Sequence, residues 1–125
     1  MNTVTGRLIY LQNVDYATID NLDLGYAITT RTAEGIRADS NSDFLTIKNT
    51  NLANRTTGLV MNGGRDLTLT NDNFSNNSQA LDLNSLTKQF AASAIIASGN
   101  NFTNSSNAIR INTLTGTNAG LGQHQ

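Results

Sequence analysis

The sequence predicts an all-β solenoid, in which short parallel strands stack while the chain winds through about four coils and a partial N-terminal coil. Three observations predict it. A phrase recurs along the chain, apolar and polar residues alternate within each copy, and asparagines return at fixed places between the apolar stretches. A fixed repeat of this size is the signature of a solenoid, since each unit buries its apolar face only by stacking on its neighbours.

The repeat is clearest in residues 45–54 (LTIKNTNLAN), 67–76 (LTLTNDNFSN) and 95–104 (IIASGNNFTN), and residues 17–24 form a diverged first copy. We align the copies on the apolar residue that ends the phrase, which is Leu24, Leu52, Phe74 or Phe102. The anchors are 28, 22 and 28 residues apart, so the uninterrupted coil is the middle one of 22 residues.

Each coil is expected to contain three short strands joined by tight polar corners. Residues 7–11 are predicted to be the last strand of the partial coil. In later coils the first strand carries alternating apolar pairs, a period of two that marks a half-buried strand: Ala17/Ile19, Leu45/Ile47, Leu67/Leu69 and Ile95/Ala97. A very short strand is centred on the anchor. The last strand carries a second set of pairs: Ile36/Ala38, Leu59/Met61, Leu81/Leu83 and Ile109/Ile111.

The polar residues between strands are equally regular. One corner holds Asn21, Asn49, Asn71 and Gly99, a second holds Asn54, Asn76 and Asn104, and a third column holds Asp23, Asn51, Asn73 and Asn101. Asn tolerates the left-handed backbone that tight corners need, and stacked Asn amides can form a ladder from coil to coil. The alternative is glycosylation at sequons such as Asn54-Arg55-Thr56.

The repeated segments, above all residues 45–54 and 57–61, resemble the right-handed parallel β-helix repeat of the pectate-lyase-like superfamily. The resemblance covers roughly residues 15 to 113. It implies a right-handed helix over residues 1–113, while residues 114–125, rich in Gly, Thr and Asn, are expected to be a flexible tail. The superfamily contains polysaccharide lyases, hydrolases and epimerases as well as surface proteins without catalysis, so the resemblance assigns no activity.

The bulk properties exclude several classes of function. The net charge of -1 and the pI of about 5.6 do not fit nucleic-acid binding, which needs a basic surface. No apolar run approaches the length of a membrane span, and no signal peptide is visible at the start. The chain has no Cys, and its single His124 excludes a multi-His metal site within one chain, so no metal or other cofactor is expected.

A candidate binding surface lies on the sheet formed by the last strand of each coil. The two longer coils carry extra residues, 26–34 and 84–93, which flank this sheet, and insertions on one face often build a binding surface. By alternation one outward row is Arg37, Val60, Asp82 and Arg110, and the next is Asp39, Asn62, Asn84 and Asn112. We predict Arg37, Asp39, Asp82 and Arg110 as ligand-binding residues for an acidic polysaccharide, whose carboxylates Arg binds in bidentate fashion.

The same surface residues also have purely structural interpretations. Asp82 and Arg110 can be a solvated cross-strand pair. The aligned Thr18, Thr46 and Thr68 suggest an ice-binding array, but Asp20 and Lys48 beside them favour an ordinary β surface.

The sequence therefore favours a non-catalytic repeat segment of a secreted or cell-surface protein, which serves as a scaffold, an adhesion module or a glycan contact. The alternative is part of a polysaccharide lyase, epimerase or hydrolase, although carboxylates are scarce on the candidate sheet. With no capping helix in sight at either end, end-to-end self-association is also predicted.

Overall fold

The computed structural model describes residues 6–26, 32–89 and 93–112, and within them the chain is an all-β solenoid of about four turns with no helix. Five parallel strands form one sheet, here sheet A, in the order β1 (Arg7–Gln12), β3 (Glu34–Asp39), β5 (Thr57–Asn62), β7 (Gln79–Asn84) and β9 (Asn107–Asn112). Four form sheet B, in the order β2 (Thr18–Asp20), β4 (Thr46–Lys48), β6 (Leu67–Thr70) and β8 (Ile95–Ser98). The predicted fold class is thus confirmed.

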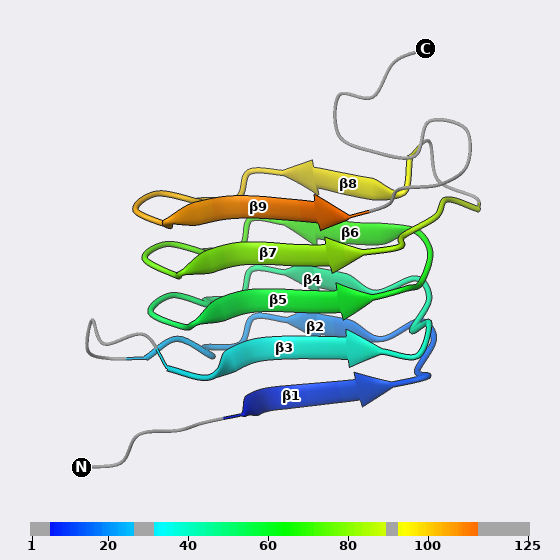
Figure 1. Cartoon of the computed structure of the whole chain (residues 1–125), viewed down its shortest axis with the longest axis horizontal. Coiled ribbons are helices and arrows are strands. Elements are labelled where there is room, and N and C mark those ends of the chain that lie inside the picture. The colour runs from blue at the N-terminus through cyan, green and yellow to red at the C-terminus, as the bar shows by residue number, and fades with distance from the viewer. Residues whose placement is uncertain (1–5, 27–31, 90–92, 113–125) are drawn as a thin grey trace.

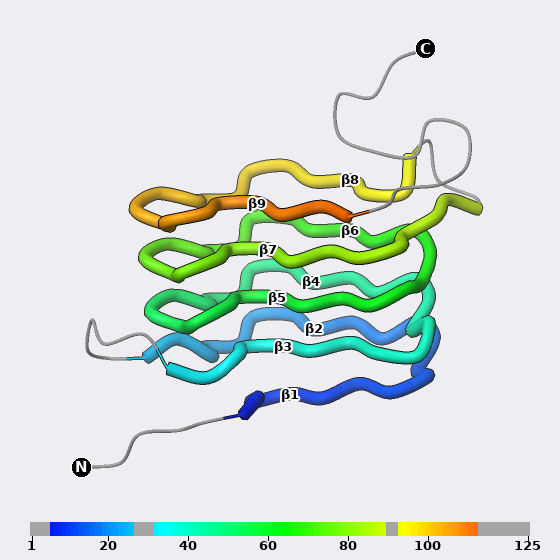
Figure 2. The backbone as a smooth tube through the Cα atoms, in the orientation of Figure 1, coloured from blue at the N-terminus to red at the C-terminus, as the bar shows by residue number. Residues whose placement is uncertain are grey.

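The two sheets face one another across the interior, with sheet A in front of sheet B in Figure 1. A third face closes each coil through single parallel bridges that link Asp23, Asn51, Asn73 and Asn101. The bridge falls one residue before the predicted centre: the backbone N–H of Leu24 donates to the carbonyl of Asn51, and the N–H of Asn51 donates to the carbonyl of Leu22. The anchor side chain, one residue further on, packs against the core. Figure 2 shows the backbone repeating nearly the same path from coil to coil.

The core lies between the three faces and is built by residues in register. Ile36, Leu59 and Leu81 are successive partners in sheet A, and Ile47 and Leu69 are partners in sheet B. All five are completely buried. The predicted alternation is therefore confirmed in the middle coils, because the apolar residues face inward and stack on their equivalents in the next coil. In the last described coil Ala97 and Ile109 are exposed.

Sheet A and the third face meet where there is no room for a side chain. A Cβ added to Gly58 would lie 2.5 Å from Cδ1 of Phe74 and 2.7 Å from the carbonyl oxygen of Ala80. Glycine is needed here because of this close approach, and it lets the aromatic anchor of the coil reach the backbone of sheet A.

The corners have the predicted left-handed backbone. Asn21, Asn49 and Asn71 have φ values of 59°, 53° and 55°, and Gly99, the equivalent residue in the next coil, has 70°. The second corner repeats the pattern, with positive φ at Asn54, Asn76 and Asn104. Asparagine therefore contributes first as a backbone residue that accepts the turn.

Asparagine contributes a second time through its side chain. In the third-face ladder, Nδ2 of Asn51 donates to Asp23 Oδ1 at 2.8 Å, Asn73 donates to Asn51 at 3.0 Å, and Asn101 donates to Asn73 at 3.3 Å. Each accepting oxygen also receives the backbone N–H two residues further along its own coil. The predicted amide ladder is thus confirmed, and it ties neighbouring coils together.

Several predictions fall outside the part of the chain that the structure describes. The expected flexible tail, residues 114–125, lies outside it, as do residues 27–31 and 90–92 within the two predicted insertions. Among the described residues there is no helix long and apolar enough to cross a membrane.

Candidate functional site on the outer face of sheet A

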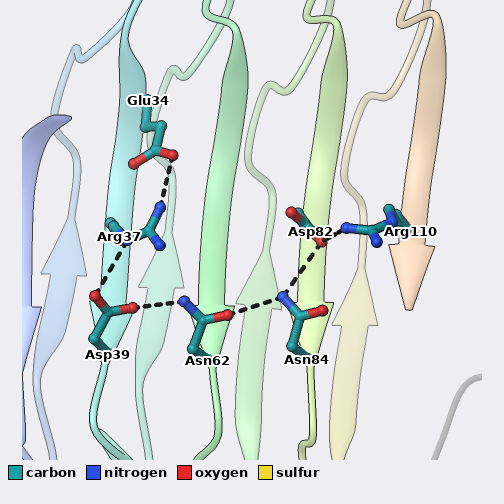
Figure 3. A network of polar contacts seen from close by, with 7 residues as sticks. All are labelled: Glu34, Arg37, Asp39, Asn62, Asp82, Asn84 and Arg110. Carbon is teal, nitrogen blue, oxygen red and sulfur yellow. Dashed lines mark hydrogen bonds and ion pairs between the residues drawn. The ribbon is translucent and has the colours of Figure 1, made fainter. Parts of the chain in front are cut away.

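The outer face of sheet A carries the four predicted residues. Arg37 of β3 is the register partner of Val60, Val60 pairs with Asp82, and Asp82 pairs with Arg110 of β9. Asp39 lies two residues after Arg37, in the next outward row. The predicted rows are therefore present, and the four side chains share one face of the solenoid (Figure 3).

The first cluster lies on β3 alone. The Arg37 guanidinium donates to Glu34 Oε2 at 2.8 Å and to Asp39 Oδ2 at 3.1 Å, so one cation lies between two carboxylates. Burial alone would lower the pKa of Arg37, but the hydrogen bonds and negative charges of Asp39 and Glu34 outweigh it and raise that pKa. Arg37 is therefore held by its own strand.

Asp39 is also held from the neighbouring strand. Nδ2 of Asn62 donates to Asp39 Oδ1 at 2.7 Å. Partial burial would raise the pKa of Asp39, but hydrogen bonds from Asn62, Arg37 and Tyr10, together with the charge of Arg37, lower it. This carboxylate is consequently stabilised in its ionised form.

The second cluster joins β7 and β9. Nη1 of Arg110 donates to Asp82 Oδ1 at 3.0 Å, and Nδ2 of Asn84 donates to the same oxygen at 3.4 Å. The predicted contact between Asp82 and Arg110 is thus present, with the Arg110 side chain 52% exposed. This is the more open of the two clusters.

A second amide ladder connects the clusters. In this sheet A ladder, Asn84 donates to Asn62 Oδ1 at 2.9 Å and Asn112 donates to Asn84 Oδ1 at 2.7 Å, above the bond from Asn62 to Asp39. Figure 3 shows the resulting chain of contacts, which runs from Glu34 on β3 to Arg110 on β9. The outer row therefore links coils in the same way as the third-face ladder.

This arrangement limits the chemistry that the face can perform. Asp39 and Asp82 lie on strands two steps apart, about 10 Å along the axis, and each is engaged by an Arg. A retaining glycosidase needs two carboxyl groups about 5 Å apart, with one free to attack. Within the described residues no group of three or more His, Cys, Asp or Glu side chains could hold a metal ion.

The open pair leads to a prediction of small effect. We expect Arg110→Ala to change the free energy of unfolding by less than about 0.5 kcal/mol, because an exposed ion pair gains little over hydration. Urea unfolding of the wild type, Arg110→Ala, Asp82→Asn and the double variant would measure the coupling between the pair. A loss above about 1 kcal/mol on removal of Arg110 would contradict an exposed pair.

A further charged residue, Arg55, has a buried position that the sequence pattern did not predict. It is 4% exposed, and its guanidinium donates to the carbonyl oxygens of Leu24 at 2.7 Å, Gly25 at 3.1 Å and Thr32 at 3.4 Å, near the ring of Tyr26. Burial lowers the pKa of Arg55. The side chain joins the two described segments on either side of residues 27–31, and in the sequence it stands only as a polar residue beside a corner asparagine.

Comparison of the chain with protein-family models, with curated proteins and with solved structures gives no match. The geometry of the chain itself therefore carries the functional argument.

Proposed function

We propose that this chain is a non-catalytic segment of a right-handed parallel β-helix of the pectate-lyase-like kind, which acts as a rigid scaffold in a secreted or cell-surface protein. The observation that carries the proposal is that the charged side chains on the outer face of sheet A already bind one another. Glu34, Arg37, Asp39, Asp82 and Arg110 are bonded to one another, directly or through the sheet A ladder. Such a face holds coils in register, whereas a catalytic face needs groups left free to react.

End-to-end association belongs to the same proposal. β1 and β9 are the outer strands of sheet A, so each pairs on one side only among the described strands. Apolar side chains in the first and last described coils are also exposed, with Leu22 at 42% and Ile109 at 39%. Unprotected strand edges and apolar coil ends favour contact with another chain.

A glycan contact is the competing function, and one observation favours it. The Asp82 and Arg110 pair combines a carboxylate with a half-exposed guanidinium, groups that bind sugar hydroxyls and uronate carboxylates. A glycan that bound here would have to break or share the ion pair.

The test measures mass by light scattering and thermal melting, each with and without an oligogalacturonate or an alginate oligomer. A scaffold is expected to show a mass that rises with protein concentration and a melting temperature that the sugar leaves unchanged. A melting temperature that rises with one oligouronate would overturn the proposal, because a ligand stabilises only the state that binds it. Arg110→Ala is the matched variant, since a shift that it abolishes would place the sugar on this face.

A further inference from the structure

Asp72 is a buried carboxylate that neither ladder uses. It follows β6 at the corner leading to the third face and is 2% exposed. Its Oδ1 accepts the backbone N–H of Thr50, in the coil below, at 3.0 Å. Its Oδ2 is buried and has no hydrogen-bond partner. A buried charged oxygen without a partner is costly, so this atom requires an explanation.

The repeat supplies two equivalents, Thr50 one coil below and Asn100 one coil above. In each, the side-chain oxygen accepts a backbone N–H from the coil beneath, at 3.4 Å for Thr50 and at 2.8 Å for Asn100. Each also donates to a backbone carbonyl, Thr50 to that of Lys48 at 2.9 Å and Asn100 to that of Leu69 at 3.1 Å. The position thus both accepts and donates, and an ionised Asp72 has no proton to donate.

A protonated Asp72 would have the hydrogen-bond donor that Thr50 and Asn100 have at this position. Asn100 donates to the carbonyl of Leu69, whose register partner one coil below is Ile47. The Thr50 hydroxyl bonds the carbonyl two residues earlier in its own coil, whereas an Asp side chain has the length and the planar end of Asn. By the Asn100 pattern, the carbonyl of Ile47 is the acceptor for Asp72. We propose that Asp72 is a proton-operated latch between coils, which carries a proton on Oδ2 and bonds the coil below in acid, and which loosens that contact when it ionises.

The surroundings of Asp72 contain little to stabilise its negative charge. Burial raises the pKa of Asp72 to about 6, against smaller lowering effects of the backbone N–H groups of Thr50 and Thr70. The described segments stacked around it, residues 46–52, 68–74 and 96–102, contain one other charged side chain, Lys48. The Lys48 ammonium lies 4.0 Å from Asp20 on the outer side of sheet B.

The direction of the pH effect follows from this. The folded chain holds the proton below about pH 6, whereas a carboxyl with the ordinary value of 3.8 holds it only in stronger acid. Stability from Asp72 therefore rises as the pH falls through about 6 and is complete below 3.8. A difference of about two pKa units corresponds to about a 100-fold change in the folding equilibrium constant.

The test compares urea unfolding of the wild type and Asp72→Asn from about pH 8 to about pH 4. The amide donates at every pH, so the variant is expected to have the larger folding equilibrium constant at about pH 8, by up to about 100-fold, with the gap closing in acid. Asp39→Asn is the matched control. It makes the same change at a carboxylate whose pKa is lowered, so there the difference between wild type and variant is expected to stay constant from about pH 8 to about pH 4 and to close only below the ordinary value of 3.8.

A gap between wild type and Asp72→Asn that does not change with pH would overturn the proposal, as would a variant that is less stable at every pH. If Asp72→Asn does not fold, carboxyl carbon NMR of the wild type decides the question. A titration midpoint for Asp72 near 6 supports the latch, and a midpoint near the ordinary value of 3.8 rejects it.

Discussion

Phe74→Ala is expected to lower the free energy of unfolding by about 3–5 kcal/mol, the range found when a large buried aromatic is truncated. Phe74 is completely buried, and its ring stacks on that of Phe102 with centroids 5.4 Å apart and an angle of 7° between the planes. The backbone of Gly58 packs against the ring with no spare room. The cavity left by Ala would therefore lie where sheet A meets the third face, with little prospect of collapse.

Urea unfolding would measure this loss, with Phe102→Ala as the matched control. Phe102 is the equivalent residue one coil further along and is only partly buried. The same truncation there is expected to cost less than about 2 kcal/mol. Equal losses for the two variants would mean that the fourth coil is covered as completely as the third.

Arg55→Ala is expected to cost about 3 kcal/mol, because it removes hydrogen bonds from a charged donor to three backbone carbonyls. Those carbonyls belong to Leu24, Gly25 and Thr32. Replacement with Ala leaves them without this donor, in a place where the guanidinium is almost completely buried. Urea unfolding at neutral pH would measure the loss.

Two variants make the Arg55 result specific. Arg55→Lys keeps the charge but not the planar fork, so we expect it to recover only part of the lost stability. Arg110→Ala removes an exposed guanidinium from the same protein and is expected to have almost no effect. If Arg55→Ala proved as mild as Arg110→Ala, the contacts with the three carbonyls would contribute nothing net.

The strands and corners could be predicted because each depends on a local pattern that the repeat displays several times. Ile47 and Leu69 face inward because both alternate with polar neighbours, and Asn49 and Asn71 mark the same corner. Once the coils are aligned, the contact between neighbouring strands follows, which is why Asp82 and Arg110 could be paired from the sequence. Their assignment to a ligand, with Arg37 and Asp39, stays a prediction.

Arg55 and Asp72 could not be found in this way because their environments do not come from the alternating pattern. Arg55 is buried by residues that lie on either side of residues 27–31, in the first of the two longer coils. Asp72 stands between the corner residue Asn71 and the third-face ladder residue Asn73, in a polar stretch of sequence that gives no sign of burial. Its equivalents, Thr50 and Asn100, are different residue types, so only the hydrogen bonds that they share show that the three residues occupy one repeated position.

Both amide ladders have a direction along the solenoid axis. In each, every Nδ2 points toward the N-terminal coil, and the lowest member is an aspartate, Asp23 or Asp39, which accepts but does not donate when ionised. The two ends of each ladder are therefore different, and the N-terminal end stops at a carboxylate that cannot donate. An engineer who lengthens it should duplicate a 22-residue coil above these two carboxylates, where each new asparagine finds an acceptor below and offers one above. An asparagine-bearing coil inserted directly beneath them, which in sheet A means between β1 and β3, would set its amide oxygen against a carboxylate.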